Sequence, residues 1–414
     1  MANVSSSNGI EKYPKLRFPQ YSDSWDGIRF GDLIEEFSHR TKIEDEDVLL
    51  SAAIEGMFLN TELFGHQRGA SNKGYKKIIY GTLVLSTQNL HLGNANVNLR
   101  FGHGMVSPAY KTYRIKDCSV KLLAEWIKSE KAKQFFYDAT TVGASVCRRN
   151  VEWETLYDQT LYLPAINEQQ HIEEFLSLVS ERICRQEKFI ENLKKYKRGV
   201  SKRFFDAIHN DQTCTVKQFS EVFELLQNNT FSRECLTDEN TEGMNVHYGD
   251  ILVKYGSVLD PDIDVVPFIK DGIDVSKFSD LSYLQDGDVI FADTAEDYTV
   301  GKICEIINVS NRKILSGLHT MPFRPTITFE PMYLGYYLNS AVFRSQILPM
   351  IQGAKVSSIS KSEMKKTIIY IPSIDRQREI VRILNALDKR IKRTELILDE
   401  LKEMKKGLLQ NLFI

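Results

Sequence analysis

The chain has 414 residues, of which 42% are hydrophobic and 26% are charged, and its formal net charge is −2. This length exceeds one ordinary hydrophobic core and predicts two or more domains, and the composition is typical of a globular protein in water. No apolar run is long enough to span a membrane, the short polar N-terminus lacks a secretory signal, and the six cysteines lack metal-ligand spacing. We therefore expect a protein of the reducing cytoplasm, without disulfides or a zinc site.

The first domain is predicted over residues 14–162, after a disordered lead at residues 1–13. Pro14 and Pro19 favour extended chain at its start. β-Branched and aromatic residues favour strands, and stretches rich in glycine and asparagine favour loops. The expected elements are a short helix or strand at Phe30–Phe37, a strand-like segment broken by glycine at Tyr75–Ser86, a loop at Asn89–Gly104 and a helix at Val120–Tyr137.

Two stretches of the chain repeat one another without a gap. Leu163–Phe205 matches Ile371–Phe413 at an offset of 208 positions. Both carry apolar residues in alternating steps of four and three, which is the pattern of a coiled-coil helix. We therefore predict one long helix at residues 163–209 and a second at residues 371–414.

Each predicted helix has a seam of side chains that would bury against the other helix. Two polar interruptions fall at equivalent places, Gln186 with Thr394 and Lys197 with Lys405. Because a polar residue in such a seam specifies register, these pairs are predicted to control the register of the helices. The predicted seam residues are Ile172, Leu176, Val179, Ile183, Gln186, Ile190 and Leu193 in the first helix, and Ile380, Leu384, Leu387, Ile391, Thr394, Leu398 and Leu401 in the second.

A second domain is predicted over residues 210–370, and it repeats the order of the first. Phe219–Leu226 takes the place of Phe30–Phe37, and Met332–Phe343 takes the helical place. Because the second helix begins where the second domain ends, it must return towards the first domain for the seams to meet. The predicted fold is therefore two α/β (α+β) domains separated by an intramolecular antiparallel pair of long coiled-coil helices. Its pseudo-two-fold repeat lies within one chain, so a homodimer is not required.

Charge is distributed unevenly along the chain. Leu63–Lys116 contains no Asp or Glu, Ile306–Ser362 contains the single acid Glu330, and Thr237–Asp297 is strongly acidic. A basic face beside an acidic face suits a protein that presents one surface to a polyanion. The alternative is that these are ordinary solvated faces.

The candidate DNA contacts are cationic, amide, hydroxyl and aromatic side chains of the basic stretches. Lysine contacts to phosphate fix register, whereas the forked arginine guanidinium and the asparagine amide discriminate guanine and adenine. For each residue the alternative is an ordinary surface side chain. The candidates are Lys73, Tyr75, Lys76, Lys77, Asn96, Arg100 and Lys111 in the first domain, and Lys302, Arg312, Lys313, Arg324, Lys355 and Ser357 in the second.

The sequence carries no motif of a catalytic chain. It has no glycine-rich cofactor loop, no GxxxxGK[ST] phosphate loop and no pair of histidines at metal-ligand spacing. We therefore expect a chain that is not an enzyme by itself and that binds neither a metal nor a cofactor.

Five segments carry a more specific signal. They are Pro14–Trp25, Pro164–Ile172, Lys194–Gly199, Gly353–Val356 and Lys405–Gln410. Together with the duplicated order of domains and helices, these segments make the chain resemble the DNA-specificity (S) subunit of type I restriction–modification systems over essentially its whole length.

The resemblance implies that each domain is a target-recognition domain for one half of a bipartite motif in double-stranded DNA. It implies that the helices set the spacer and dock two methyltransferase (M) subunits, which bind S-adenosylmethionine and methylate adenine. Motor-nuclease (R) subunits would add translocation and cleavage that depend on ATP and Mg. The implied setting is the cytoplasm of a bacterium or archaeon. One departure is Asp375-Arg376 in the second helix, where the first has Asn167-Glu168.

The rival interpretation belongs to a different class of protein. It is a non-catalytic, duplicated coiled-coil scaffold whose globular ends hold other proteins. The acidic stretch Thr237–Asp297 favours it, because an acidic surface repels DNA.

Overall fold

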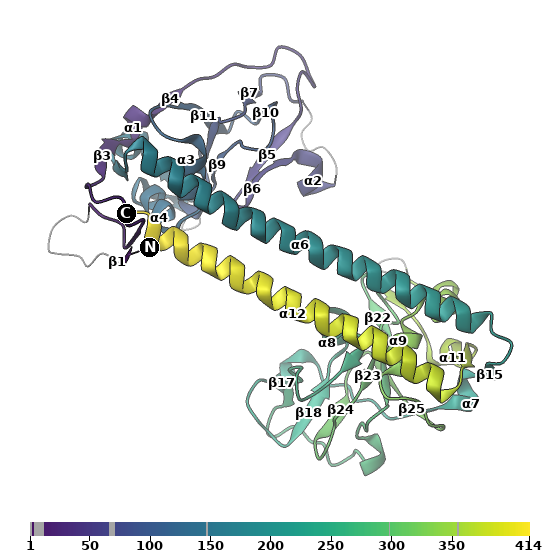
Figure 1. The fold of residues 1–414 in the computed structure, drawn as a ribbon. Helices are drawn as coiled ribbons and strands as arrows, with labels where there is room; N and C mark the ends of the chain where they lie inside the picture. The colour runs from purple at the N-terminus through teal and green to yellow at the C-terminus, as the bar shows by residue number, and fades with distance from the viewer. Residues whose placement is uncertain (1, 4–11, 66–70, 146–147, 298, 354–355) are drawn as a thin grey trace. The chain divides into compact units, whose positions relative to one another are not determined.

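The computed structural model forms two compact units, and each unit contains part of both long helices. Unit 1 comprises Met1–Lys188 and Leu396–Ile414, and unit 2 comprises Phe189–Glu395. The long helices are α6 (Ile166–His209) and α12 (Ile374–Leu412), drawn in teal and yellow in Figure 1. The structure describes residues 2–3, 12–65, 71–145, 148–297, 299–353 and 356–414, so most of the predicted disordered lead lies outside the described residues.

Unit 1 is an α/β domain made of short elements. They are β1 (Ala2–Asn3), β2 (Leu16–Arg17), β3 (Asp26–Arg29), α1 (Phe30–Leu33), β4 (Ile34–Glu36), β5 (Leu50–Ala53), β6 (Gly56–Leu59), α2 (Asn60–Phe64), β7 (Lys76–Ile79), β8 (Leu83–Ser86), β9 (Ala95–Val97), β10 (His103–Val106), β11 (Tyr110–Ile115), α3 (Val120–Trp126), α4 (Glu130–Asp138), β12 (Thr140–Ser145), β13 (Arg148–Val151), α5 (Trp153–Asp158) and β14 (Thr160–Leu163).

The sheet of unit 1 has four strands in the order β4–β11–β8–β9. All four side chains of β8 are buried, as expected for a central strand covered on both faces. β7 pairs separately with β10. Gly81, with φ of +82°, lies between β7 and β8 in a conformation that favours glycine. The predicted strand-like segment broken by glycine is therefore confirmed.

Unit 2 repeats this plan with larger sheets. Its elements are β15 (Thr215–Gln218), α7 (Phe219–Val222), β16 (Phe223–Leu225), β17 (Leu236–Thr237), β18 (Gly243–Val246), α8 (Tyr248–Val253), β19 (Val258–Leu259), β20 (Phe268–Ile269), β21 (Val289–Ala292), β22 (Thr294–Ala295), β23 (Ile303–Ile306), β24 (Lys313–Ser316), β25 (Thr320–Pro325), α9 (Tyr333–Leu338), α10 (Ala341–Ile347), β26 (Ser357–Ser358), α11 (Lys361–Met364) and β27 (Ile368–Ile371).

Two sheets form most of unit 2. One has the order β16–β25–β21–β23–β19 and the other has the order β17–β20–β18–β24. The pairing of β18 with β24 is parallel, whereas β21 is antiparallel to both of its neighbours. Mixed sheets of this kind are typical of α/β and α+β domains.

Each long helix leaves its domain through the same arrangement of strands. In unit 1, β3 pairs antiparallel with β14, which leads into α6; in unit 2, β15 pairs with β27, which leads into α12. A short helix follows each of these strands. Helix α1 follows β3 and buries Phe30 completely, and helix α7 follows β15 and buries Phe219 completely. The structure therefore repeats the order that the sequence repeats.

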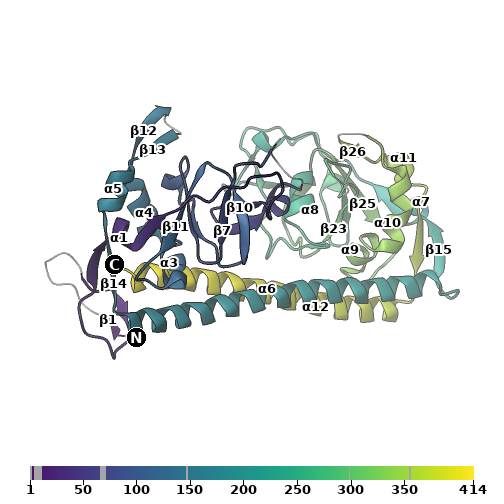
Figure 2. The same ribbon diagram turned by 90° about the horizontal axis from the view of Figure 1, so that it is seen from above.

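Helices α6 and α12 lie side by side and antiparallel within each unit (Figures 1 and 2). In unit 1, Lys402 contacts Glu187 and Lys405 contacts Ser180, each at 2.8 Å, so numbers rise along α12 as they fall along α6. This geometry and the two α/β domains confirm the predicted fold class. Unit 2 shows the same direction in the pairs Lys194–Glu395 and Lys197–Asp388.

The predicted seam coincides with the buried stripe of the two helices. Of its fourteen side chains, ten are buried, and Ile183, Leu387, Leu398 and Leu401 are half-buried. The first turns of the seam also enter the domain cores. Leu176 belongs to the core cluster of Trp25, and Leu384 belongs to that of Phe219. Each helix is thereby packed into the domain from which it starts.

One predicted element of unit 1 was wrong, and a second is helical as predicted but divided in two. The predicted loop Asn89–Gly104 contains β9 and the start of β10, because antiparallel pairing with β8 overrides the low strand propensity of its composition. The predicted helix Val120–Tyr137 is divided into α3 and α4. The division occurs because the Ser129 hydroxyl accepts a hydrogen bond from the backbone N–H of Ala132 at 3.0 Å, which caps a new helix.

Candidate nucleic-acid interface

Two predicted cations of unit 1, the exposed Arg100 and the half-buried Lys77, are paired with acids. Arg100 donates two hydrogen bonds to Glu62, at 2.7 and 2.8 Å, and these hold the pKa of the Glu62 carboxyl below its ordinary value. Lys77 pairs with Glu46. Glu46 and Glu62 both precede the acid-free stretch in the sequence, so the fold brings acids from outside this stretch to neutralise two of its cations. A phosphate contact at either position would have to compete with a carboxylate.

Two other predicted residues of unit 1 point inward. The Lys76 ammonium donates to the backbone carbonyl of Tyr110 at 2.7 Å, and burial lowers its pKa. The side-chain amide of Asn96 donates to the backbone carbonyl of Ala53 at 2.7 Å. Both placements favour a role in holding loops and strands together, rather than in contacting DNA.

The remaining cations of unit 1 differ in surroundings. Lys73 is exposed in the turn before β7, and no described acid forms an ion pair with it. Lys111 pairs with Glu36 at 2.8 Å, and its ammonium lies 4.3 Å from the centre of the Trp153 ring. Lys73 is therefore the predicted cation of unit 1 best placed for a phosphate.

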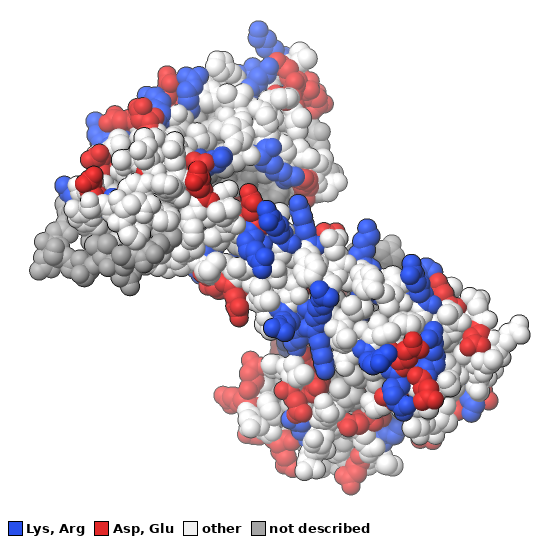
Figure 3. Space-filling view, in the orientation of Figure 1, with Lys and Arg blue, Asp and Glu red and all other residues white. Residues whose placement is uncertain are grey.

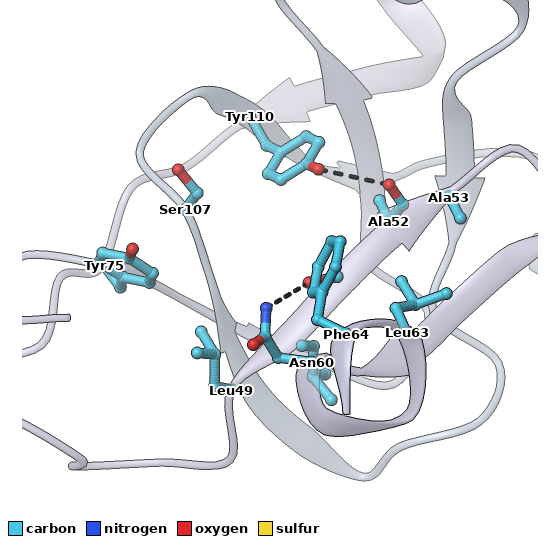
Figure 4. A pocket seen from close by; sticks show the side chains of 11 residues that line it. Leu49, Ala52, Ala53, Asn60, Leu63, Phe64, Tyr75, Ser107 and Tyr110 are labelled. Atoms are coloured by element: carbon cyan, nitrogen blue, oxygen red, sulfur yellow. Dashed lines mark hydrogen bonds between the residues drawn. The ribbon is translucent and has the colours of Figure 1, made fainter. Parts of the chain in front are cut away.

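An aromatic pocket lies between α2, β5 and the turn into β11, and its lining includes Tyr75, two residues after Lys73 (Figure 4). Its volume is about 370 Å³, and its walls include the rings of Tyr75, Phe64 and Tyr110. Asn60 and Ser107 add an amide and a hydroxyl, and the Tyr110 hydroxyl donates to a backbone carbonyl of β5 at 3.3 Å. Flat rings beside hydrogen-bonding groups suit contact with a nucleobase.

In unit 2, two predicted cations are structural. The Lys302 ammonium donates to the backbone carbonyls of Leu252 and Tyr255, each at 2.9 Å, and burial lowers its pKa. Arg324 makes a bidentate pair with the buried Asp288, at 2.7 and 2.9 Å. These side chains join α8 and β21 to the rest of the domain.

Two further predicted cations of unit 2 pair with acids of its acidic stretch. Arg312 contacts Asp262 at 2.6 Å, and Lys313 contacts Glu242 at 2.5 Å. The carboxylates of Asp262 and Glu242 are mostly exposed, so these pairs are weak at physiological salt.

A cluster at the start of β25 was not found from the sequence. The Tyr248 ring lies 5.4 Å from the ring of exposed His319, and Arg233 makes a bidentate pair with Asp250 at 2.8 and 2.9 Å. His247, whose pKa is lowered by burial, accepts a hydrogen bond from the backbone of α8 at 3.1 Å. Tyr248, Arg233 and His247 lie in or next to the acidic stretch, which a search for basic segments passes over.

The strand pair β22–β26 adds a predicted residue to this cluster. Ser357 on β26 is opposite Ala295, and the neighbouring Thr294 hydroxyl lies 3.4 Å from His319 Nδ1. Ser357 therefore lies across the strand pair from the neighbour of Thr294, which contacts His319. Lys355, the remaining predicted contact, lies outside the described residues.

The start of each long helix is tied to its domain by a glutamine. The Gln169 carbonyl accepts from the backbone N–H of Ser119 at 2.9 Å, and its amide donates to the carbonyl of Pro164 at 2.9 Å. Gln377 makes the equivalent bonds to Glu330 and Pro372, each at 3.0 Å. The sequence marked these two residues only by their identity at duplicated positions, and a polar side chain gave no reason to expect burial.

Lys197 and Lys405, the predicted register residues, reach equivalent positions on the opposite helix. Lys197 contacts Asp388 at 2.5 Å, and Lys405 contacts Ser180 at 2.8 Å. Positions 180 and 388 are themselves 208 apart, so the two contacts are copies. Lys405 also pairs with Glu125 of α3 at 2.7 Å. A polar contact that joins two helices at one fixed position favours a role in register.

The departure at the second helix start changes one of these attachments. In unit 1, Glu168 and Arg17 form a buried bidentate pair at 2.7 and 2.8 Å, which fixes the N-terminal segment on α6. In unit 2, Arg376 stands at the equivalent position and pairs with Glu379 on its own helix at 2.5 Å. The two attachments are therefore not identical.

Two searches of the described residues found no feature of another class. No group of three or more His, Cys, Asp or Glu side chains is arranged to hold a metal ion among the residues with described positions. No described helix, the two long ones included, is both long enough and apolar enough for a membrane span.

The structure thus defines a class of protein with two duplicated α/β domains, each fixed to one helix of an antiparallel pair. Residues 212–403 match the family described as "Type I restriction modification DNA specificity domain". The chain is also 24% identical over 288 residues to the type I restriction enzyme EcoBI specificity subunit of Escherichia coli. That match covers 62% of this chain and 58% of the length of that relative.

Solved structures show the same fold over nearly the whole chain. The S subunit of a type I restriction–modification system from M. genitalium has a TM-score of 0.50 and 15% identity, with 97% of this chain and 99% of that chain covered. A chain from a structure on complex assembly and conformational transition of the type I system has a TM-score of 0.55 and 15% identity, with 94% and 97% covered. The resemblance predicted from the sequence motifs is therefore confirmed: the chain is similar to specificity subunits of type I restriction–modification systems.

Proposed function

We propose that this chain is the DNA sequence-recognition subunit of a type I restriction–modification complex. Each α/β domain reads one half of a bipartite motif, and the helix pair sets the spacer between the halves. In unit 1 the reading surface includes Lys73 and the aromatic pocket around Tyr75. In unit 2 it includes Tyr248, His319 and Ser357.

The observation that carries the proposal is the duplicated attachment of a domain to a helix. Gln169 and Gln377 make the same two buried hydrogen bonds, and Leu176 and Leu384 enter the corresponding cores. A domain held this firmly keeps its position along its helix, which is what a spacer requires. The family of residues 212–403 and the relative from Escherichia coli support the same function.

The chemistry belongs to partner subunits in this proposal. Two methyltransferase subunits dock on the helices, bind S-adenosylmethionine and methylate adenine in the recognised motif. Motor-nuclease subunits bring ATP- and Mg-dependent translocation and cleavage of unmethylated DNA. The chain itself contributes recognition and geometry, and it acts in the cytoplasm without forming a homodimer.

Mapping of modified bases tests the proposal directly. The chain is expressed with its methyltransferase subunit in a host without other adenine methylation, and methylated motifs are read by sequencing. We expect one motif with two specified halves and an unspecified spacer of fixed length. A single contiguous motif, or no methylation that depends on this chain, would contradict the proposal.

The alternative function is a non-catalytic scaffold for proteins. The acidic stretch Thr237–Asp297 favours it, with Asp262 and Glu242 mostly exposed. A mobility-shift assay of the chain with its methyltransferase subunit at increasing salt separates the two functions. DNA recognition predicts binding that weakens steeply with salt, because phosphate contacts release counterions; a scaffold predicts no DNA complex at any salt.

A further inference from the structure

The two helices expose large apolar side chains at duplicated positions, so that each unit carries one member of each matched pair. In unit 2, Phe189 and Tyr196 are one heptad apart on α6, so they share a face. In unit 1, Ile397 and Met404 stand at the duplicated positions on α12. Large apolar side chains that stay exposed on a helix face are typical of protein–protein interfaces. The matched pairs, with exposed fractions between 36% and 62%, are Phe189 with Ile397, Tyr196 with Met404, and Ile374 with Ile166.

The charges around these apolar side chains are reversed between the units. Three exposed positions are acidic in unit 1 and basic in unit 2 at the same offset of 208. The difference in charge extends beyond these three positions. The helical residues of unit 1 have a net charge of −2, whereas those of unit 2 have a net charge of +7. The reversed pairs are Glu174 with Arg382, Glu181 with Lys389, and Glu403 with Lys195.

The net charges follow from a count over the helical residues of each unit. Residues 166–188 and 396–412 of unit 1 contain six Lys or Arg and eight Asp or Glu, whereas residues 189–209 and 374–395 of unit 2 contain thirteen and six. Figure 3 shows Lys and Arg side chains gathered along the long helices. This surface is therefore a property of many residues on both helices.

The basic residues of the reversed pairs are not neutralised within the described chain. No described acid forms an ion pair with Lys195, Arg382 or Lys389. In unit 1, Glu181 pairs with Arg185 at 3.1 Å, but more than half of each side chain stays exposed. Ion pairs within the described chain therefore do not cancel the charge of either helix surface.

We propose that the two helix surfaces bind identical methyltransferase subunits with unequal affinity, and that the basic surface of unit 2 takes the acidic face of one copy more tightly. This inference rests on the proposed function, which places two copies of one subunit on duplicated surfaces. The shared apolar side chains supply the common contact. The reversed charges then attract the first copy and repel the second.

A protein partner fits this surface better than DNA does. The exposed ring of Phe189 lies 5.5 Å from the Arg390 guanidinium, and the exposed Tyr196 directly follows Lys195. Aromatic rings among arginines are enriched in protein interfaces, whereas a phosphate backbone gives apolar side chains nothing to contact. Identical copies present the same face, so a face that complements Arg382 meets like charge at Glu174, and like-charge contacts lower affinity.

The test is a titration of the full chain with its methyltransferase subunit, followed by sedimentation velocity at low and high salt. At low salt we expect the first copy to bind about tenfold or more tightly than the second. At high salt the two steps should converge, because screening weakens the contacts between exposed charges. The wild-type chain should therefore populate the 1:1 complex beyond the share that two equal sites would give only at low salt.

Two matched triple variants show which helix surface is responsible for the tight binding step and which for the weak one. Lys195→Glu, Arg382→Glu and Lys389→Glu together should weaken the tight step by about tenfold or more. Glu174→Arg, Glu181→Lys and Glu403→Lys together should strengthen the weak step and remove the difference between the copies. All six positions are exposed, and helix content measured by circular dichroism establishes that each variant is folded.

Other outcomes overturn the inference in distinct ways. Two copies that bind with equal affinity and equal salt dependence contradict the inequality but leave the proposed function intact. If the unit 2 variant loses DNA binding and keeps its tight methyltransferase step, the basic surface contacts nucleic acid. If the chain binds no methyltransferase copy at any salt, the proposed function itself is contradicted.

Discussion

Gln169 and Gln377 make the same two hydrogen bonds at the starts of two different helices, although the domains that they hold have diverged. Each side chain is at least 95% buried, and each joins a proline carbonyl before its helix to a backbone N–H of its own domain. A buried amide that satisfies the same two backbone groups twice has a structural role that both copies need. The attachment of domain to helix is thus the part of the duplication that the fold repeats most closely.

Removal of either glutamine should loosen one domain. Gln169→Ala leaves the Ser119 N–H and the Pro164 carbonyl without these partners, and an unsatisfied buried group costs about 1–3 kcal/mol. Urea unfolding should show a loss of that order, and Gln377→Ala should show the same. Gln170→Ala is the matched control, because this neighbour is exposed and should change stability by less than about 0.5 kcal/mol. Equal effects at positions 169 and 170 would contradict the role assigned to the buried amide.

Lys405 should matter more than its exposed neighbour Lys402. The Lys405–Glu125 pair is about 15% exposed at both ends, whereas Lys402–Glu187 is about 50% exposed. Lys405→Ala removes the buried cation of a mostly buried carboxylate and leaves it only the more exposed Lys128, at 3.2 Å, so it should cost about 1–3 kcal/mol. Lys402→Ala should cost less than about 1 kcal/mol. The comparison uses urea unfolding, and a further Glu125→Gln change should recover part of the Lys405→Ala loss.

Glu305 should make unit 2 less stable as pH rises. Burial raises the pKa of this carboxyl from its ordinary 4.5 to about 8, against hydrogen bonds from the backbone N–H groups of Met332 and Gly335 at 2.6 and 2.8 Å. Between pH 4.5 and about 8 the folded state therefore binds more protons than the unfolded state, so stability falls with pH through this window.

Glu305→Gln removes the titrating group and keeps one of the two acceptor oxygens, whereas its amide nitrogen replaces the other, so only the pH dependence of its stability is compared with that of the wild-type chain. Urea unfolding at several pH values should show that the wild-type chain loses stability, on the order of 2 kcal/mol, between pH 5 and pH 8. The variant should show a smaller dependence over the same range. An identical pH dependence in the two proteins would mean that other groups cause it.

The large-scale plan was predictable because it depends on patterns that repeat. A heptad stripe and an offset of 208 positions identify both helices and their antiparallel direction, since chain connectivity permits one return path. The strand β9 was missed because its stability comes from pairing with β8 and not from its asparagine-rich composition. The break between α3 and α4 depends on one serine, Ser129, whose capping role a helical pattern does not reveal.

The candidate site was less predictable because charge along a sequence differs from charge on a surface. Lys76 is buried and Lys302 is half-buried, and both ammonium groups donate to backbone carbonyls. Arg100 is paired with Glu62, from outside the acid-free stretch. Tyr248 was missed for the opposite reason, since it lies in an acidic segment and only the fold brings it to His319. Long-range contacts of this kind follow from the tertiary structure and have no local signal.

Tyr75 and Tyr248 should each control one half of the recognised motif. Tyr75→Ala opens the aromatic pocket of unit 1, so methylation should tolerate more bases at one position of one half-site. Tyr248→Ala should have the same effect on the other half-site. Base-modification sequencing measures both, and exposed Tyr80, which is not in the lining of that pocket, provides the control variant Tyr80→Ala. Relaxation of both half-sites by one variant would contradict the division of reading between the units.

The spacer should lengthen when both helices gain one heptad. Seven residues inserted after Gln186 in α6 and after Thr394 in α12 preserve the seam, because these positions are equivalent. Each insertion adds about 10 Å of helix, which corresponds to about three base pairs of DNA. The motif found by base-modification sequencing should keep both half-sites and gain about three unspecified positions.

An insertion in α6 alone is the control for this prediction. It leaves seven residues of α6 opposite no additional residues of α12, so either the pair Ser180–Lys405 or the pair Glu187–Lys402 must lose its register. This variant should unfold at lower urea concentration and methylate poorly, whereas the double insertion should do neither. If the double insertion changed the bases of either half-site, the helices would take part in reading the sequence, and the separation of spacer from recognition would be wrong.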